Sequence, residues 1–285
     1  FLHFSLFVIS CSSDDSQVNK DAIGMENLAG LDFTQSERDT LLPGLKVFKG
    51  QYDTLRTVAL NNSVPVPLYF DPRLPGQALP TGKDSYRFQE FPTKRPQNIE
   101  ECAFYTIGQL AHLIRTRQVT SLELTTMYLE RLKRHGPTLE CVVTLTEELA
   151  LKQARRADKN IKAGRYLGPL HGIPYGAKDL LAVPGYKTTW GAMTHKDQVL
   201  DETATVVQKL EDAGAVLVAK LTLGALAWGD VWYGGKTRNP WNTEQGSSGS
   251  SAGPGSATAA GLVAFAIGSE TWGSIVSPAD RNGVT

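Results

Sequence analysis

Apolar residues recur at helical spacing in several stretches of the chain. The clearest is VTSLELTTMYLERLKRHGP, residues 119–137, in which leucines mark one apolar face. Thr120 and Glu123 have the spacing of a capping box, in which each side chain accepts a hydrogen bond from the other's backbone N–H. We therefore predict that a helix begins at Thr120 and that Gly136 and Pro137 end it.

The flanking stretches predict three further elements. TIGQLAHLIRTRQ, residues 106–118, is amphipathic, and CVVTL, residues 141–145, is a short apolar run typical of a strand. Thr144 and Glu147 repeat the capping-box spacing, which predicts a helix over residues 147–164.

Beyond residue 171, short apolar runs alternate with helical windows. The runs GIPYGAKDL (172–180), AVLVAK (215–220) and GLVAFAIG (261–268) surround helical stretches such as TATVVQKLEDAG (203–214). This alternation predicts an α/β domain, with a mixed β-sheet covered by helices on both faces.

The first eleven residues, FLHFSLFVISC, are mostly apolar and precede the polar run SSDDSQ. They contain the apolar stretch and a cleavage-like VISC of a secretory signal, but no basic head and no Met, so we expect the sequence to begin inside a longer protein. The run resembles the end of a bacterial lipoprotein signal, which predicts a lipid on Cys11, residues 12–30 as a polar tether, and a secreted or lipid-anchored protein at the cell envelope. The run is too short to span a bilayer. The alternative is a buried N-terminal strand in a cytoplasmic protein.

Residues 31–98 show no chemistry of their own. Their first part has apolar residues at helical spacing, interrupted at Pro43, and VPVPLYFDPRLPG (64–76) is proline-rich and extended. We expect this block to wrap a main domain that covers residues 99–285.

Composition excludes several classes of protein. The 285 residues include 29 Lys and Arg and 29 Asp and Glu, so the net charge of zero offers no basic surface for nucleic acid. With 41% hydrophobic residues the chain can bury a core. Three cysteines make neither a disulfide framework nor a metal cluster, and no metal or cofactor is expected. We expect Cys102 and Cys141 to be ordinary buried thiols.

Lys178 is the first candidate for chemistry. It follows the apolar stretch GIPYGA, and a lysine that faces the interior at a strand end loses solvation, which lowers its pKa and lets the neutral amine act as a base. The alternative is a surface lysine paired with Asp179. This stretch alone favours the surface alternative.

GSSGSSAGPGSATAAG, residues 246–261, is the second candidate. It could be a flexible linker, but it passes directly into a pattern typical of a packed helix and strand. Its G-x-S-x-G match would make Ser251 the nucleophile of an α/β-hydrolase, which needs a histidine further along the chain. All five histidines precede Ser251, so that interpretation fails. The stretch also lacks the G-K-[ST] ending of a phosphate-binding loop.

The third candidate is GSETWGSIVSPA, residues 268–279. Ser274 follows Gly273 where the chain turns after an apolar run, and neighbouring backbone N–H groups could converge there on a developing oxyanion. The alternative is a plain serine in a tight turn, and this stretch alone favours that alternative.

Together, GIPYGAKD, SGSSAGP and GSETWGSIVSPA resemble the ordered motifs of the amidase signature family over residues 99–285. The resemblance implies the amidase-signature fold and a Ser–cisSer–Lys triad that hydrolyses an amide bond of a small molecule or peptide. Ser274 would be the nucleophile, Ser250 the bridging serine and Lys178 the base. The backbone N–H groups of Thr271, Trp272, Gly273 and Ser274 would form the oxyanion hole.

The sequence departs from the family pattern at five positions. These are Glu270 for aspartate, Trp272 for glycine, Ala252 for glycine, Pro254 for serine and Val276 for arginine. The chain also ends at RNGVT, where the family continues, so we expect its C-terminal part to be missing. Two alternatives stay open: the amidotransferase subunit that releases ammonia from glutamine for tRNA-dependent amidation, and a catalytically dead, lipid-anchored binding protein with Trp272 filling the oxyanion turn.

Overall fold

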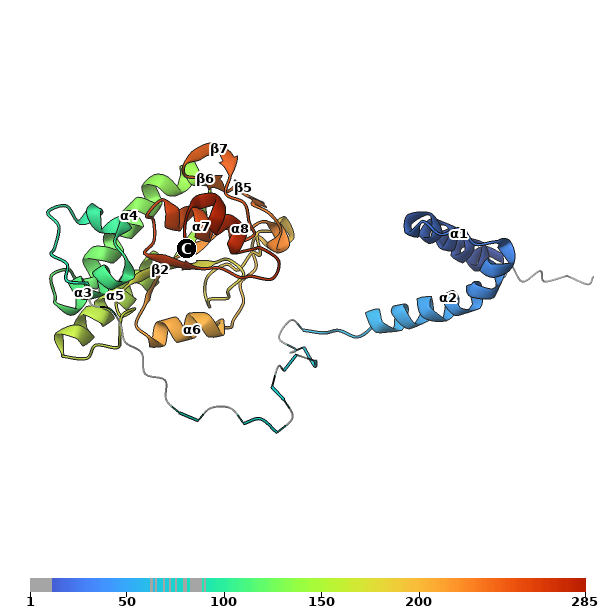
Figure 1. The fold of residues 1–285 in the computed structure, drawn as a ribbon, viewed down its shortest axis with the longest axis horizontal. Helices are drawn as coiled ribbons and strands as arrows, with labels where there is room; N and C mark the ends of the chain where they lie inside the picture. Colours follow the sequence, from blue (N-terminus) through green and yellow to red (C-terminus); the bar gives the residue numbers. More distant parts are fainter. Residues whose placement is uncertain are drawn as a thin grey trace, which may run out of the picture. The chain divides into compact units, whose positions relative to one another are not determined.

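The structure is a computed structural model that describes residues 12–61, 64, 66–68, 70–71, 73–74, 76–78, 81–82, 89 and 91–285. The chain divides into two compact units, Phe1–Lys83 and Asp84–Thr285 (Figure 1). Cys11 and the rest of the predicted leader lie outside the described residues. Within the described part, no helix combines the length and apolar character needed to cross a membrane.

The first unit contains two helices, α1 (Ser12–Ala29) and α2 (Gln35–Arg56). Residues 12–29, predicted to belong to a polar tether, thus form a helix. The sequence is polar, but Val18, Ala22 and Glu26 are spaced four residues apart and form a buried stripe on α1.

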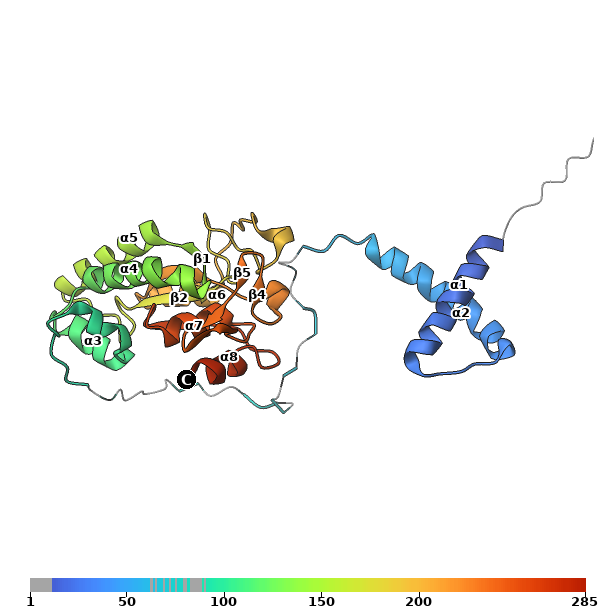
Figure 2. The ribbon, with the colours of Figure 1, turned by 90° about the horizontal axis from the view of Figure 1, so that it is seen from above.

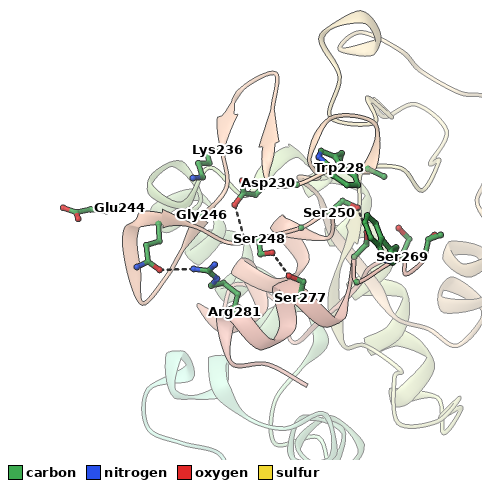
Figure 3. Close-up of a pocket in the computed structure, with 18 residues that line it drawn as sticks. Trp228, Asp230, Lys236, Glu244, Gly246, Ser248, Ser250, Ser269, Ser277 and Arg281 are labelled. Atoms are coloured by element: carbon green, nitrogen blue, oxygen red, sulfur yellow. Dashed lines mark hydrogen bonds between the residues drawn. The ribbon is translucent and has the colours of Figure 1, made fainter. Parts of the chain in front are cut away.

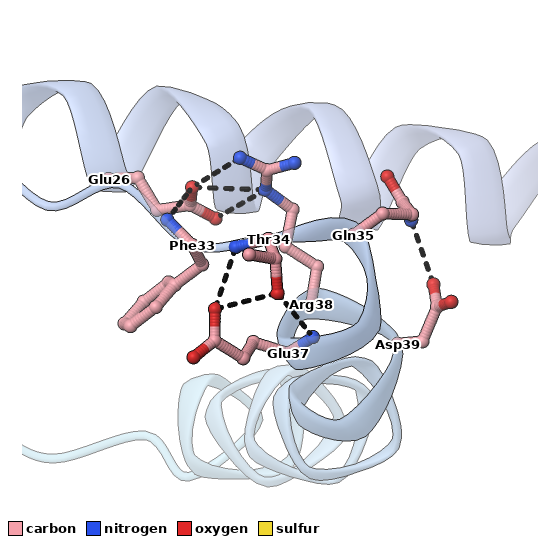
Figure 4. A network of polar contacts seen from close by, with 7 residues as sticks. All are labelled: Glu26, Phe33, Thr34, Gln35, Glu37, Arg38 and Asp39. Atoms are coloured by element: carbon pink, nitrogen blue, oxygen red, sulfur yellow. Dashed lines mark hydrogen bonds and ion pairs between the residues drawn. The ribbon is translucent and has the colours of Figure 1, made fainter.

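A network of polar contacts holds the turn between α1 and α2 (Figure 4). The guanidinium of Arg38 lies 2.9 Å from a carboxylate oxygen of Glu26, which also accepts a hydrogen bond from the backbone N–H of Phe33. Thr34 and Glu37 form a capping box at the start of α2. These contacts explain how a charged segment forms a helical pair.

Two prolines lie inside helices that they were predicted to interrupt or end. Pro43 lies within α2, and Pro137 lies within α4 (Ser121–Leu139). A proline removes one backbone hydrogen bond, and the rest of the helix keeps its own. In α4, the last residue, Leu139, is buried in the core, so packing supports the final turn.

The second unit begins earlier than the predicted boundary at residue 99. The side chain of Gln118 donates a hydrogen bond to the carbonyl of Thr93, and Arg95 lies 2.7 Å from Glu123. These contacts attach the segment before residue 99 to the start of α4. They explain why it belongs to the second unit.

The predicted mixed sheet is confirmed. Its strand order is β1-β3-β2-β8, with β1 antiparallel to β3, and β2 parallel to both β3 and β8. The strands are β1 (Val142–Leu145), β2 (Pro174–Lys178), β3 (Val216–Leu221) and β8 (Phe265–Ile267). Two small hairpins pair β4 (Val231–Trp232) with β5 (Gly235–Lys236) and β6 (Arg238–Asn239) with β7 (Asn242–Gly246).

Helices cover both faces of this sheet (Figures 1 and 2). On one face, Val207 and Leu210 of α6 (Thr205–Asp212) pack with Tyr175 and Ala177 of β2. On the other face, α4, α5 (Glu147–Lys162) and α7 (Ala252–Ala259) contribute to a core cluster with β3. The remaining helices are α3 (Ile107–Arg115) and α8 (Val276–Asn282), and the short 3₁₀ segments are η1 (Ile99–Phe104), η2 (Met193–His195) and η3 (Ala225–Ala227).

The pleat of β2 decides where Lys178 points. Alternate residues of a strand face opposite sides of the sheet, so Lys178 shares its face with Gly176 rather than with Tyr175 and Ala177. Gly176 has no room for a side chain, since a Cβ there would lie 2.3 Å from the Leu221 side chain. Because Leu221 packs in the same cluster as α7, Lys178 points toward the face that α7 covers.

One of the two predicted capping boxes is confirmed. Thr120 and Glu123 form it at the start of α4. The box predicted at Thr144 is wrong, because Thr144 belongs to β1 and Thr146 is the N-cap of α5. The hydroxyl of Thr146 makes no capping bond and donates instead to the buried carbonyl of Leu217, 2.7 Å away.

Candidate active site

Lys178 ends β2 and is fully buried. Its Nζ lies within hydrogen-bond distance of three serine hydroxyls: 2.8 Å from Ser250, 3.0 Å from Ser251 and 2.8 Å from Ser269. No described carboxylate forms an ion pair with it. The amine is therefore surrounded by neutral groups that can both donate and accept hydrogen bonds.

The surface alternative for Lys178 is wrong. Its neighbour Asp179 pairs with Lys220 of β3, and the Asp179 Oδ1 and Lys220 Nζ atoms lie 2.8 Å apart with both side chains fully buried. The other carboxylate oxygen of Asp179 accepts hydrogen bonds from the backbone N–H and hydroxyl of Thr189. This pair fixes the chain after β2 without using Lys178.

The surroundings of Lys178 change its acidity. Burial lowers the pKa of Lys178 to about 8, because a desolvated ammonium is disfavoured, and the negative charge of Glu270 opposes part of that shift. An amine with this pKa is partly neutral near neutral pH, as a proton acceptor must be.

The serine-rich stretch is a packed loop followed by α7, so the linker alternative is wrong. Ser250 and Ser251 are buried, and the peptide bond between Gly249 and Ser250 is cis. A Cβ at Gly249 would lie 1.8 Å from the Gly229 carbonyl oxygen. The loop thus passes too close to neighbouring backbone for any larger residue.

Ser274 lies in the turn between β8 and α8. Its Oγ is 3.1 Å from the Oγ of Ser250, and its carbonyl accepts a hydrogen bond of 2.9 Å from the backbone N–H of Ser251. The buried side-chain amide of Asn282, at the end of α8, donates to the carbonyl of Ser247. The structure therefore brings Lys178, Ser250 and Ser274 into one continuous row of contacts.

Glu270 occupies part of the turn that was predicted to be the oxyanion hole. Its carboxylate accepts the backbone N–H groups of four successive residues: Gly273, Ser274, Ile275 and Val276. Hydrogen bonds from Ile275 and Val276 in particular lower the pKa of Glu270.

Two of the four predicted donors, Gly273 and Ser274, are therefore engaged by Glu270, because its carboxylate reaches their N–H groups. The N–H groups of Thr271 and Trp272 make no hydrogen bond to any described residue. Of the four predicted donors, these are the two whose N–H groups are not already bound by another described residue.

The Trp272 indole does not fill the turn. It is 81% exposed, and its ring lies 5.9 Å from the ring of Trp228. An indole this exposed is not packed into the turn, so the filled oxyanion turn of the binding-protein alternative is not observed.

A cavity of about 900 Å³ adjoins part of this site (Figure 3). Ser250, Ser269 and Ser274 line it together with Trp228 and Trp272. Its other lining residues include Asp230, Lys236, Glu244, Gln245, Ser248, Ser277 and Arg281. In Figure 3, Trp228 lies toward the Ser250 and Ser269 side of the cavity, and Arg281 lies on the opposite side.

Sequence reasoning missed three residues of this site. Ser269 contacts Lys178 and lies inside the GSETWGSIVSPA stretch, from which only Ser274 was chosen as a catalytic side chain. Lys220, which pairs with Asp179, was not singled out at all. Trp228 meets Trp272 from a distant part of the chain. A hydroxyl directly after the last apolar run was the one local signal that could have indicated Ser269.

Comparison with known proteins identifies the family. The family model named Amidase matches residues 123–285, which is more than half of the chain. The chain belongs to the amidase family. The A-type subunit of glutamyl-tRNA(Gln) amidotransferase from Azoarcus sp. (strain BH72) is 42% identical over 183 residues, which are 63% of this chain and 37% of that protein. The amidase-family chain thus spans less than two fifths of the length of this relative.

Solved structures support the same family assignment. The peptide amidase from Stenotrophomonas maltophilia matches with a TM-score of 0.60 and 37% identity, over 64% of this chain and 39% of that one. A structure titled fatty acid amide hydrolase matches with a TM-score of 0.59 and 27% identity, over 63% of this chain and 32% of that one. The predicted amidase-signature fold is confirmed.

Both predicted thiols are buried, and burial raises the pKa of Cys102 to about 11 and that of Cys141 to about 12. Such thiols are poor nucleophiles. Among the described residues, no group of three or more His, Cys, Asp or Glu side chains is placed to hold a metal ion.

Proposed function

We propose that the protein hydrolyses a carbon–nitrogen amide bond through an acyl-enzyme on Ser274. The observation that carries the proposal is the row of contacts from Lys178 Nζ to Ser250 Oγ, 2.8 Å, and from Ser250 Oγ to Ser274 Oγ, 3.1 Å, at the wall of the cavity. Membership of the amidase family supports the same chemistry.

The proton follows this row in both directions. Neutral Lys178 accepts the Ser250 proton while Ser250 accepts the Ser274 proton, and the Ser274 oxygen forms a bond to the amide carbon. The ammonium then returns a proton through Ser250 to the leaving nitrogen as the carbon–nitrogen bond breaks. Water, deprotonated along the same row, cleaves the acyl-enzyme and restores Ser274.

The oxyanion of the tetrahedral intermediate needs hydrogen-bond donors. The unoccupied N–H groups of Thr271 and Trp272 support this role, and each donor contributes about 3 kcal/mol in other hydrolases. Glu270 holds the next two N–H groups, so we propose a hole built from Thr271 and Trp272.

The test is covalent labelling of the purified protein with a fluorophosphonate, followed by peptide mass spectrometry. We expect the label on Ser274, its loss in Ser274→Ala, and much slower labelling in Lys178→Ala. Ser277→Ala removes a hydroxyl of the same cavity and should label like the unchanged protein. Labelling elsewhere, or labelling that does not depend on Lys178, would overturn the proposal.

The amidotransferase subunit remains a second candidate, supported by 42% identity to a protein of that kind. It uses the same amide cleavage, with glutamine as substrate. Ammonia release from glutamine that rises several-fold when a partner protein co-purifies would favour it. Hydrolysis of other amides by the isolated protein, with no activity on glutamine, would exclude it.

We further propose that Cys11 carries a lipid at a bacterial cell envelope. The support is the leader-like composition of residues 1–11. Labelled palmitate should enter the protein and be lost in Cys11→Ala, and palmitate that persists in this variant contradicts the proposal.

A further inference from the structure

Two tryptophans form an apolar surface beside Ser274. Trp228 is 71% exposed and Trp272 is 81% exposed, and their ring centroids lie 5.9 Å apart at an angle of 31°. Both line the cavity that contains Ser250 and Ser274. Large exposed apolar side chains that adjoin one another usually mark a binding surface.

The backbone before Trp228 is tightly folded. Leu226 and Ala227 have φ angles of 52° and 64°, which non-glycine residues rarely adopt. A Cβ at Gly224 would lie 2.0 Å from the Trp228 carbonyl oxygen, so the loop folds tightly on itself. Left-handed backbone at two successive residues costs free energy. Such a conformation persists only where the surrounding structure fixes it, and it is often found at functional sites.

Trp272 lies close to Ser274 along the chain. Only Gly273 separates the two residues, so the indole lies at the edge of the reacting centre. Trp272 also stands where the family pattern has glycine, which makes this surface a property of this chain rather than of the fold.

We propose that Trp228 and Trp272 form a subsite for a planar aromatic group of the amide substrate. The proposal rests on the proposed function and names the substrate class of the same site. The two indoles contact each other too closely to enclose a ring between them, so the substrate ring stacks on their shared exposed surface. Flat aromatic faces favour another aromatic ring over an aliphatic chain of similar area.

Away from the two tryptophans, charged side chains line the cavity, so the tryptophan surface is its apolar end. Lys236, Glu244 and Arg281 line it as well and carry charges of both signs. An aromatic group placed there would remove solvation from those charges without gaining stacking. The tryptophan surface is therefore where an aromatic group binds with least cost.

The test compares kcat/KM for matched amides with the purified protein. Phenylacetamide carries a ring on the acyl side, 4-nitroacetanilide carries one on the amine side, and acetamide carries none. We expect at least one aromatic amide to be preferred over acetamide by about tenfold or more. Trp272→Gly and Trp228→Ala should each reduce this ratio several-fold, whereas Trp241→Phe, a change at an exposed tryptophan outside the cavity lining, should keep it.

A binding experiment separates failure of the subsite from failure of the proposed function. In Ser274→Ala, phenylacetamide should quench indole fluorescence with saturation, and Trp272→Gly in that background should weaken the apparent affinity several-fold. Hydrolysis of acetamide without aromatic preference overturns the subsite and keeps the proposed function. Absence of Ser274 labelling and of all hydrolysis overturns the proposed function, and the fluorescence titration then decides the subsite by itself.

Discussion

Asp179 follows Lys178 in the sequence but pairs with Lys220, 2.8 Å away in a site without solvent access. The last residue of β2 and the residue after it thus have separate partners: the carboxylate neutralises a lysine of β3, and the amine faces serine hydroxyls. Because Asp179 is occupied, no adjacent carboxylate holds Lys178 in its charged form.

The buried pair predicts a large effect on stability. Asp179→Asn leaves the Lys220 ammonium buried without an opposite charge, which should reduce the free energy of unfolding by about 3–5 kcal/mol. The exposed pair Lys187–Asp197, at 2.9 Å, provides the control, and Asp197→Asn should cost less than about 1 kcal/mol. Urea unfolding followed by circular dichroism measures both. Equal losses in the two variants would contradict this prediction.

The acidity of Lys178 predicts the pH dependence of catalysis. The amine must be neutral to accept a proton, and its pKa is lowered by burial to about 8, so kcat/KM should rise with pH through about 8 and then level off. Glu270→Gln removes a negative charge that favours the ammonium. The pH at which kcat/KM rises should then be lower, even if the plateau value of kcat/KM also changes. A rise that stays in place or moves to higher pH would argue against Lys178 as the base.

The three hydroxyls around Lys178 should differ in importance. Ser250→Ala breaks the row to Ser274 and should lower kcat by at least about a hundredfold. Ser269→Ala removes one hydrogen bond to the amine, 2.8 Å long, and should lower kcat by about tenfold or less. Steady-state kinetics on one amide measures both, with Ser277→Ala as the control. A larger loss in Ser269→Ala than in Ser250→Ala would reject the proposed order of proton transfer.

Gly249 predicts a loss of function through backbone crowding. A Cβ in Gly249→Ala would lie 1.8 Å from the Gly229 carbonyl oxygen, so the loop must move and carry Ser250 with it. We expect fluorophosphonate labelling of Ser274 to fall by at least about tenfold. Gly44→Ala in α2, where nothing lies within 4 Å, should label normally. Normal labelling of Gly249→Ala would show that the loop tolerates displacement.

Local patterns predicted the elements whose signals are contained in a few neighbouring residues. The strand that ends at Lys178 and the capping box at Thr120 are of this kind, because period and spacing are properties of the segment itself. The order of motifs also indicated that Lys178, Ser250 and Ser274 belong together.

Features that depend on distant partners were not predictable in the same way. Thr146, rather than Thr144, precedes α5 because its hydroxyl reaches the carbonyl of Leu217, 71 residues away. The helix α1 needs the Glu26–Arg38 pair to offset its polar composition. The capture of backbone N–H groups by Glu270 depends on how a turn folds, which residue spacing does not encode.

Ser250 and Ser274 are linked through their flanking backbone. The N–H of Ser251 donates to the Ser274 carbonyl, 2.9 Å away, and Asn282 connects α8 to Ser247. Trp228 takes part in neither link. The reacting hydroxyls therefore keep their spacing when the Trp228 side chain changes, so new substrate preferences can evolve at that position without rebuilding the machinery that cleaves the bond.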